Sequence, residues 1–250
     1  MAGKFMSKWI LEVKEVTKRF GGIVALRNVN VRVKKGSITG LIGPNGSGKT
    51  TLFNVITGFI RADSGEVLFN GKKIKRLRPY EISRTGIART FQVPKPFKGI
   101  SIIENVAAAL VAQGSGLKDA QEKSLELLRF LKLDDKCSMR AGLLNHVEMK
   151  KLELARALAT NPKILLIDEG LAGLNMTEIY DMLKIFERVR DEFNITIFWI
   201  EHVMGAIMNL AEYIIVLSNG EKIAEGTPPE ISRDKKVIEA YLGEEYVISK

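Results

Sequence analysis

The chain has 250 residues, of which 46% are hydrophobic and 27% charged, and its formal net charge is +9. This is the composition of a globular chain that can bury a sizeable core, either as one large domain or as a core with a subdomain. A single cysteine, Cys137, excludes an intramolecular disulfide and favours a reducing compartment. The apolar runs are shorter than the roughly 18 residues that a membrane helix needs, and no signal peptide is indicated. We therefore expect a cytoplasmic chain that reaches a membrane only through a partner.

The positive charge is spread along the sequence and is densest at residues 72–78. A basic surface can attract nucleic acid or an anionic membrane, or it can simply be solvated. Aromatic residues do not interleave with this cluster, as stacking on bases would require. We favour a solvated surface, keep attraction to a membrane as the alternative, and expect no nucleic-acid partner.

The spacing of hydrophobic residues divides the chain into two kinds of region. Up to about residue 92, and again after residue 161, short apolar strands alternate with helical patterns, which indicates a parallel sheet with right-handed crossovers. Between about 102 and 160, apolar residues recur at three- and four-residue spacing, which predicts an inserted helical subdomain. We expect an N-terminal antiparallel β unit from strands at 9–16 and 29–33, joined by a turn at 18–22. The other predicted strands are 37–42, 66–69, 164–167, 195–200, 213–217 and 220–225, and the other predicted helices are 51–56, 175–193, 203–211 and a tail at 229–243.

This patterning predicts a single domain over residues 1–250. Its α/β core comprises 8–92 and 161–228, its helical subdomain 93–160, and its C-terminal helical tail 229–250.

Residues 43–50 fit the phosphate-loop pattern G-x-x-x-x-G-K-[ST], between a predicted strand and a predicted helix. Such a loop gathers main-chain N–H groups around a concavity at the positive end of the helix dipole, which attracts a polyphosphate. Lys49 is expected to reach the β- and γ-phosphates, and the Thr50 hydroxyl to bind Mg²⁺. The predicted nucleoside triphosphate site comprises Gly43, Pro44, Asn45, Gly46, Ser47, Gly48, Lys49, Thr50 and Thr51.

Polar residues follow two of the predicted strands, 164–167 and 195–200, at the end where an open parallel sheet gathers its ligands. Gln92 lies where the α/β pattern gives way to the helical one. Asp168 is predicted to hold Mg²⁺, and Glu169 to polarise an attacking water. Gln92 can bind Mg²⁺ or that water, and His202 can donate to the γ-phosphate. Taken singly, Gln92 would be a solvated residue and His202 a structural one, so both assignments depend on the whole set.

The order of these motifs resembles the nucleotide-binding domain of ABC transporters over nearly the whole chain. Residues 86–92 are similar to the glutamine loop of the branched-chain amino acid import subfamily, and 237–243 resemble its C-terminal extension. The resemblance implies a P-loop NTPase α/β core with an antiparallel β unit and an inserted helical subdomain. It also implies that an aromatic residue after the first strand stacks on adenine, which gives Phe20 this role, with Val24 and Ala25 as the nearby apolar wall.

The family's signature motif, close to Leu-Ser-Gly-Gly-Gln, falls on residues 144–149 and is altered here. Asn145 replaces the serine and Val147 a glycine. Asn145 can still cap the helix, but a β-branched valine crowds a close approach of the backbone to phosphate. Asn145, Val147 and Glu148 are the residues expected at the partner's nucleotide. His146 is either part of this contact loop or an ordinary surface histidine.

Two further positions depart from the family pattern. Gly170 stands where a proline follows the catalytic acid, and Asn175 where the next loop has an aspartate. Gly170 directly follows the predicted catalytic acid, Glu169, and Asn175 lies in the loop after it.

The resemblance implies an ATPase that powers a membrane transporter, with ATP and Mg²⁺ as cofactors and branched-chain or related amino acids as the imported solutes. Two domains act head to tail, and the altered signature makes a heterodimer with a second ATPase subunit preferable to a homodimer with two degenerate sites. Integral membrane permease subunits would dock near residues 93–105 and hold the chain at the inner face of the cell membrane. The alternatives are a soluble single-domain ABC ATPase, as in cofactor assembly, and a regulatory ATP-binding subunit with low turnover.

Overall fold

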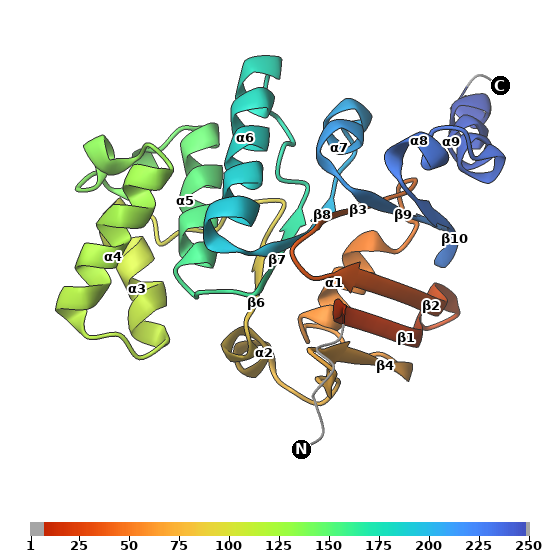
Figure 1. Ribbon diagram of the computed structural model, residues 1–250, viewed down its shortest axis with the longest axis horizontal. Coiled ribbons are helices and arrows are strands. Elements are labelled where there is room, and N and C mark those ends of the chain that lie inside the picture. Colours follow the sequence, from red (N-terminus) through yellow and green to blue (C-terminus); the bar gives the residue numbers. More distant parts are fainter. Residues whose placement is uncertain (1–7, 249–250) are drawn as a thin grey trace. The chain divides into compact units, whose positions relative to one another are not determined.

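The structure, a computed structural model, describes residues 8–248, and in the last helix it describes side chains only as far as residue 241. The chain folds into two compact units, whose helices and strands are labelled in Figure 1. Of the described residues, 8–82 and 196–248 belong to the first unit, and 83–195 to the second. The predicted subdomain limits at 93 and 160 stay a prediction.

The first unit contains an antiparallel sheet of order β2-β1-β4-β5. Its strands are β1 (Trp9–Phe20), β2 (Ile23–Lys34), β4 (Ser64–Phe69) and β5 (Lys72–Lys73). Apolar residues such as Val31 and Val33 alternate along β2 with exposed polar ones, so one face of the sheet is buried. The predicted turn at 18–22 is too long, because Phe20 pairs with Ile23 and is the last residue of β1. Gly21 and Gly22 alone form the turn.

A mainly parallel group of strands completes the first unit, in the order β10-β9-β3-β8. Its strands are β3 (Ile38–Ile42), β8 (Thr196–Ile200), β9 (Tyr213–Ser218) and β10 (Glu221–Gly226). All residues of β3 and β8 are buried, as expected of parallel strands covered on both faces. Helix α1 (Lys49–Ile56) packs on this group through Phe53, whose ring centroid lies 5.1 Å from that of Phe198.

The C-terminal tail is helical, as predicted for residues 229–243. It contains two helices, α8 (Pro228–Ile231) and α9 (Lys235–Ile248), and α7 (Met204–Leu210) precedes them in the chain. Thr227 begins α8 with a capping box to Glu230. Residues 232–234 link the two helices.

The second unit combines a parallel strand pair with helices. Strand β6 (Ile87–Thr90) pairs in register with β7 (Ile164–Asp168), so that Thr90 lies opposite Ile167. The helices are α3 (Ile102–Ala112), α4 (Leu117–Phe130), α5 (His146–Leu158) and α6 (Met176–Phe193), and α2 (Pro79–Thr85) leads into the unit. Helices α3, α4 and α5 confirm the predicted helical texture between about 102 and 160. Within residues 8–248, no helix is both long and apolar enough to cross a membrane.

Candidate functional site

The phosphate loop joins the end of β3 to the first turn of α1, and its shape depends on two glycines. A Cβ atom on Gly43 would lie 2.0 Å from the carbonyl oxygen of Leu217, and one on Gly48 would lie 2.5 Å from that of Ala25. Gly43 and Gly48 also have positive φ angles of 150° and 101°, which other residues rarely adopt. Strands β2 and β9 therefore approach the loop so closely that only glycine fits.

Lys49 is turned onto the loop itself. Its Nζ donates to the carbonyl oxygens of Gly43 at 2.7 Å and of Pro44 at 2.9 Å. Lys49 is 6% exposed. Its buried ammonium is therefore satisfied by hydrogen bonds to the main chain of the phosphate loop. The amide of Gly220, in the β9–β10 turn, donates to the carbonyl of Ser47 and supports the loop from another side.

The predicted base-stacking residues lie on the hairpin beside this loop. Phe20 is 46% exposed at the end of β1, and the Lys18 ammonium lies 5.3 Å from its ring centroid. Val24 and Ala25 are half-buried on β2, and Ala25 is the residue whose carbonyl approaches Gly48. An exposed aromatic ring, an apolar wall and a phosphate loop thus come together in one unit, as a nucleotide site requires.

His202 follows β8 in the first unit, on a turn held by its neighbour Glu201. The Glu201 side chain is 1% exposed and accepts the main-chain N–H groups of His202 at 2.8 Å and Val203 at 3.2 Å. Sequence reasoning missed Glu201. The available signal was a carboxylate directly after a fully buried strand.

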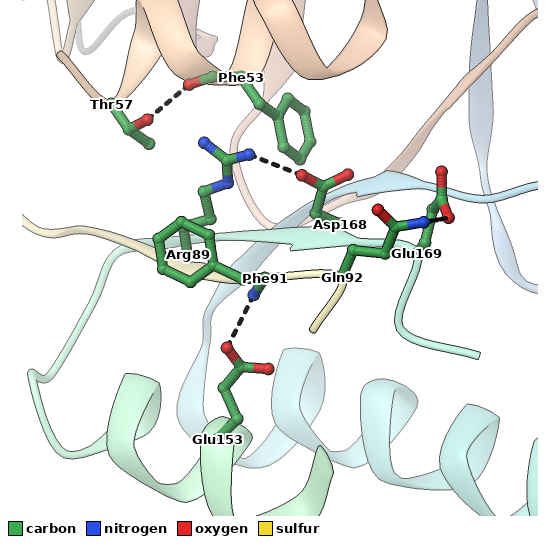
Figure 2. Close-up of polar contacts among 8 residues, drawn as sticks. All are labelled: Phe53, Thr57, Arg89, Phe91, Gln92, Glu153, Asp168 and Glu169. Carbon is green, nitrogen blue, oxygen red and sulfur yellow. Dashed lines mark hydrogen bonds and ion pairs between the residues drawn. The ribbon is translucent and has the colours of Figure 1, made fainter. Parts of the chain in front are cut away.

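Asp168 is the last residue of β7, and its carboxylate forms a buried ion pair with Arg89 on β6. Figure 2 shows the two side chains facing each other, with Arg89 Nη2 at 2.6 Å from Asp168 Oδ2. Their side chains are 5% and 4% exposed, so each neutralises a charge that would be costly to bury alone. Arg89 was not among the predicted site residues, and strand β6, which carries it, was not among the predicted strands.

Glu169 and Gln92, both predicted to act at the γ-phosphate, meet directly. The Gln92 Nε2 donates to Glu169 Oε2 at 2.5 Å (Figure 2). Glu169 has a φ angle of 50°, in the left-handed region that is unusual for a residue other than glycine. The main chain therefore turns sharply after Asp168 and directs the Glu169 carboxylate towards the glutamine loop.

Comparison with known proteins assigns the family. Residues 26–172 match the family described as ABC transporter, and residues 221–247 match that described as branched-chain amino acid ATP-binding cassette transporter. The chain is 42% identical to a probable branched-chain amino acid transport ATP-binding protein, LivG, from Archaeoglobus fulgidus, over 94% of this chain and 95% of the relative. The chain belongs to the ABC transporter family, in the subfamily of branched-chain amino acid transport ATP-binding proteins.

Solved structures agree with this assignment. The ADP conformation of MJ1267, an ATP-binding cassette of an ABC transporter, matches with a TM-score of 0.86 and 37% identity, over 95% of this chain and 100% of that one. The cassette MJ0796, in a dimeric post-hydrolysis state bound to ADP and Pi, matches with a TM-score of 0.79 and 27% identity, over 87% and 98%. The predicted ABC ATPase fold is therefore confirmed, and the chain is an ATP-binding cassette.

The segment predicted to carry the altered ABC signature begins helix α5 and has its own capping. Asn145 Oδ1 accepts the N–H of Glu148 at 2.9 Å, and the Glu148 carboxylate accepts the N–H of Asn145 at 3.0 Å. Burial alone would raise the pKa of Glu148, but the Lys136 ammonium and the Asn145 N–H together lower it. This segment is thus a well-capped helix start, with Val147 half-buried in the first turn.

The structure gives a local reason for each of the other two departures from the family pattern. A Cβ on Gly170 would lie 2.7 Å from Ile167 Cγ2 and 3.1 Å from Phe186 Cζ, so the packing favours glycine there. Asn175 caps α6 through a capping box with Glu178. Because aspartate and asparagine cap helices about equally well, this replacement keeps the helix start.

Glu153 is a buried carboxylate on α5 that the sequence analysis did not select. Its Oε1 accepts the N–H of Phe91 at 2.9 Å, next to Gln92, as Figure 2 shows. Burial raises the pKa of Glu153 to about 7, although the Phe91 N–H and the charges of Lys150, Arg156 and Arg89 oppose this. Glu153 connects the signature helix to the start of the glutamine loop.

Proposed function

We propose that the chain is the ATP-hydrolysing subunit that powers import of branched-chain or related amino acids. The observation that carries this proposal is the match of residues 221–247 to the branched-chain amino acid cassette family, which lies outside the general ATPase motifs. The name of the Archaeoglobus fulgidus relative supports the same solute class.

In this proposal the first unit binds the nucleotide. Phe20 stacks on adenine, with Val24 and Ala25 beside it, and the amides of residues 43–51 receive the phosphates. Lys49 exchanges the carbonyls of Gly43 and Pro44 for phosphate oxygens.

The predicted donors for Mg²⁺ are the Thr50 hydroxyl, the Gln92 amide oxygen and the Asp168 carboxylate. All are hard oxygen donors of the kind that Mg²⁺ prefers, so the donor chemistry fits the ion. When bound, it would neutralise charge developing on the phosphates. Arg89 fixes the orientation of the Asp168 carboxylate through their ion pair.

Hydrolysis requires that Glu169 accept a hydrogen bond from the attacking water. Since Gln92 donates to Glu169 in this structure, the amide must exchange that bond for the water or the γ-phosphate. This exchange makes the glutamine loop a sensor of the nucleotide. His202, on the turn held by Glu201, donates to the γ-phosphate.

The second half of each site comes from a partner cassette. The dimeric cassette bound to ADP and Pi supports pairing as the working arrangement. Val147 stands where a glycine would let backbone approach phosphate, so a homodimer would carry two degenerate sites. We infer a heterodimer with one competent site, formed by this chain's phosphate loop and the signature of a second ATPase subunit.

Permease subunits would dock near residues 93–105. Val93, Phe97 and Ile100 are 65%, 55% and 37% exposed there, more apolar surface than solvent alone favours. Gln92 directly precedes these side chains. Movement of Gln92 would therefore be transmitted to a permease segment that covers them.

Reconstitution in vesicles tests the proposal. The chain is co-purified with its permease and second ATPase, and ATP turnover is measured with leucine, with lysine and without solute. Stimulation of several-fold by leucine but not by lysine is expected. Stimulation by an unrelated solute alone would contradict the amino-acid assignment, and failure to associate with any permease would favour the soluble ATPase.

A second candidate function, favoured by the altered signature, is that of a regulatory subunit that binds ATP with low turnover. A single-turnover experiment with the assembled complex separates the two. A regulatory subunit binds ATP and leaves it uncleaved on its own phosphate loop, whereas the proposed subunit cleaves it.

A further inference from the structure

One face of the signature helix α5 carries four polar side chains, which we name the α5 stripe: His146, Lys150, Glu153 and Arg156. Their spacing of four, three and three residues places them along the same side of the helix. Each of them bonds a main-chain group outside the helix, in the two loops that carry Glu169 and Gln92.

The N-terminal half of the α5 stripe holds the segment that follows Asp168. His146 Nε2 lies 3.0 Å from the carbonyl oxygen of Ala172, and Lys150 Nζ donates to that of Glu169 at 3.4 Å. A Cβ on Gly173 would lie 3.1 Å from His146 Nε2, so the histidine is packed against this segment. The helix thereby fixes the main chain on which the Glu169 carboxylate is carried.

The C-terminal half holds the glutamine loop on both sides of Gln92. Glu153 accepts the Phe91 N–H at 2.9 Å, and Arg156 Nη1 donates to the Lys95 carbonyl at 3.0 Å. The Arg156 guanidinium also lies 5.0 Å from the ring centroid of Phe97. The main chain is thus held one residue before Gln92 and three residues after it.

Charged groups at these positions are costly unless they are bonded. Lys150 and Glu153 are only 5% and 8% exposed, where an apolar side chain would pack at lower cost. A main-chain hydrogen bond, unlike apolar packing, fixes direction as well as distance. The α5 stripe therefore places the two loops instead of merely covering them.

We propose that the α5 stripe makes the signature helix and the loops of Gln92 and Glu169 move as one body. Given the proposed paired cassettes, on which this inference rests, contact of the signature with the partner's nucleotide is then coupled to the placement of Gln92 and Glu169 at this chain's own nucleotide. His146, Lys150, Glu153 and Arg156 are positioning residues that need not touch ATP.

Hydrogen–deuterium exchange of the full chain tests the contact without any nucleotide. Glu153→Ala removes the acceptor of the Phe91 N–H, whereas Glu153→Gln keeps a side-chain oxygen. Glu126→Ala on α4 is the matched control, because this carboxylate is exposed in the same unit. The Phe91 amide should exchange about tenfold faster in Glu153→Ala, with near-normal rates in the other two, because its buried hydrogen-bond acceptor is lost. A normal rate in Glu153→Ala would overturn the inference.

The coupling itself is read from ATP binding and turnover. Glu153→Ala should bind ATP to the isolated chain with a Kd within about twofold of normal, while kcat of the assembled complex falls about tenfold at unchanged KM, since one positioning hydrogen bond is lost. Glu153→Gln should restore most of kcat. Wild-type kcat in Glu153→Ala would overturn the coupling.

Lys150→Met provides an independent variant should Glu153→Ala fold poorly. It removes the donor to the Glu169 carbonyl, and we expect the same loss of kcat with normal ATP binding. Wild-type kcat in Lys150→Met would also overturn the coupling. Absence of ATP binding by the wild-type chain would instead contradict the proposed function, so the two failures are distinguishable.

Discussion

The phosphate loop and the carboxylate region are built in opposite ways. The loop is shaped by its own residues, since two glycines without Cβ atoms leave room for β2 and β9, and Lys49 bonds carbonyls five and six residues before it. The carboxylates are positioned by distant side chains, because Arg89 lies 79 residues from Asp168 and Gln92 lies 77 residues from Glu169. A site shaped by its main chain is therefore recognisable as a sequence motif. A site positioned by distant side chains appears in the sequence only as isolated residues in strands and helices.

The largest expected effect is on turnover and comes from the carboxylate region. Glu169→Gln should preserve ATP binding and lower kcat of the assembled complex by about a thousandfold, because the general base is lost. The measurement is steady-state ATP hydrolysis, with dimer trapping followed by gel filtration. Unchanged turnover would remove Glu169 from the catalytic role and leave the carboxylate region without its main function.

The buried ion pair should show how strongly the same region depends on distant partners. Arg89→Met leaves the Asp168 carboxylate buried without its guanidinium, and breaking such a pair should cost about 3 kcal/mol in the free energy of unfolding. Chemical denaturation measures this cost. Arg188→Met is the control, since its ion pair with Glu192 is exposed and should contribute under about 1 kcal/mol. Equal effects would mean that burial does not set the strength of the Asp168 pair.

The substitution Lys49→Ala tests the phosphate loop. Loss of the ammonium should weaken ATP binding about 100-fold, because charge-assisted hydrogen bonds to phosphate are among the strongest in proteins. Isothermal titration calorimetry measures the Kd, with the exposed Lys72→Ala as a control for net charge. Normal binding by Lys49→Ala would reject the phosphate-loop assignment.

The smallest effect concerns the pH dependence of stability. Because burial raises the folded-state pKa of Glu153 to about 7, the folded chain holds this proton more tightly than the unfolded chain. The contribution is complete below the unfolded pKa and is lost as pH rises through about 7. The charges facing Glu153, on Lys150, Arg156 and Arg89, moderate the shift without reversing it.

The expected loss from this group is about 1 kcal/mol between pH 6 and 8. Denaturation midpoints at the two values test it, and Glu153→Gln should show a correspondingly flatter profile. An identical pH dependence in the variant would assign the change to other groups.

The same contrast explains what could be predicted from the sequence. Strands with buried runs, such as β3 and β7, and the phosphate loop follow from local patterns of apolar residues and glycine. Phe20 was placed in a turn, because the pairing that extends β1 depends on β2 and not on local propensity. The tail was predicted only as helical, and its division into α8 and α9 was not predicted.

Residues that act through another element could not be found by motif. Arg89, Glu153 and Glu201 are charged residues within or beside buried segments, and the sequence indicates only that each needs a partner. The partner of Arg89 became clear from the pairing of β6 with β7, and that of Glu153 from the position of α5 against the glutamine loop. The roles of the predicted ATP and Mg²⁺ ligands stay predictions.

The burial of Lys49 has a consequence for the thermodynamics of nucleotide capture. Its ammonium has already left bulk water when the chain folds, since the carbonyls of Gly43 and Pro44 hold it. Arrival of a phosphate therefore exchanges one set of acceptors for a stronger one and does not have to strip a hydrated cation. The cost of dehydrating the ammonium is therefore part of folding and is not incurred again when the nucleotide binds.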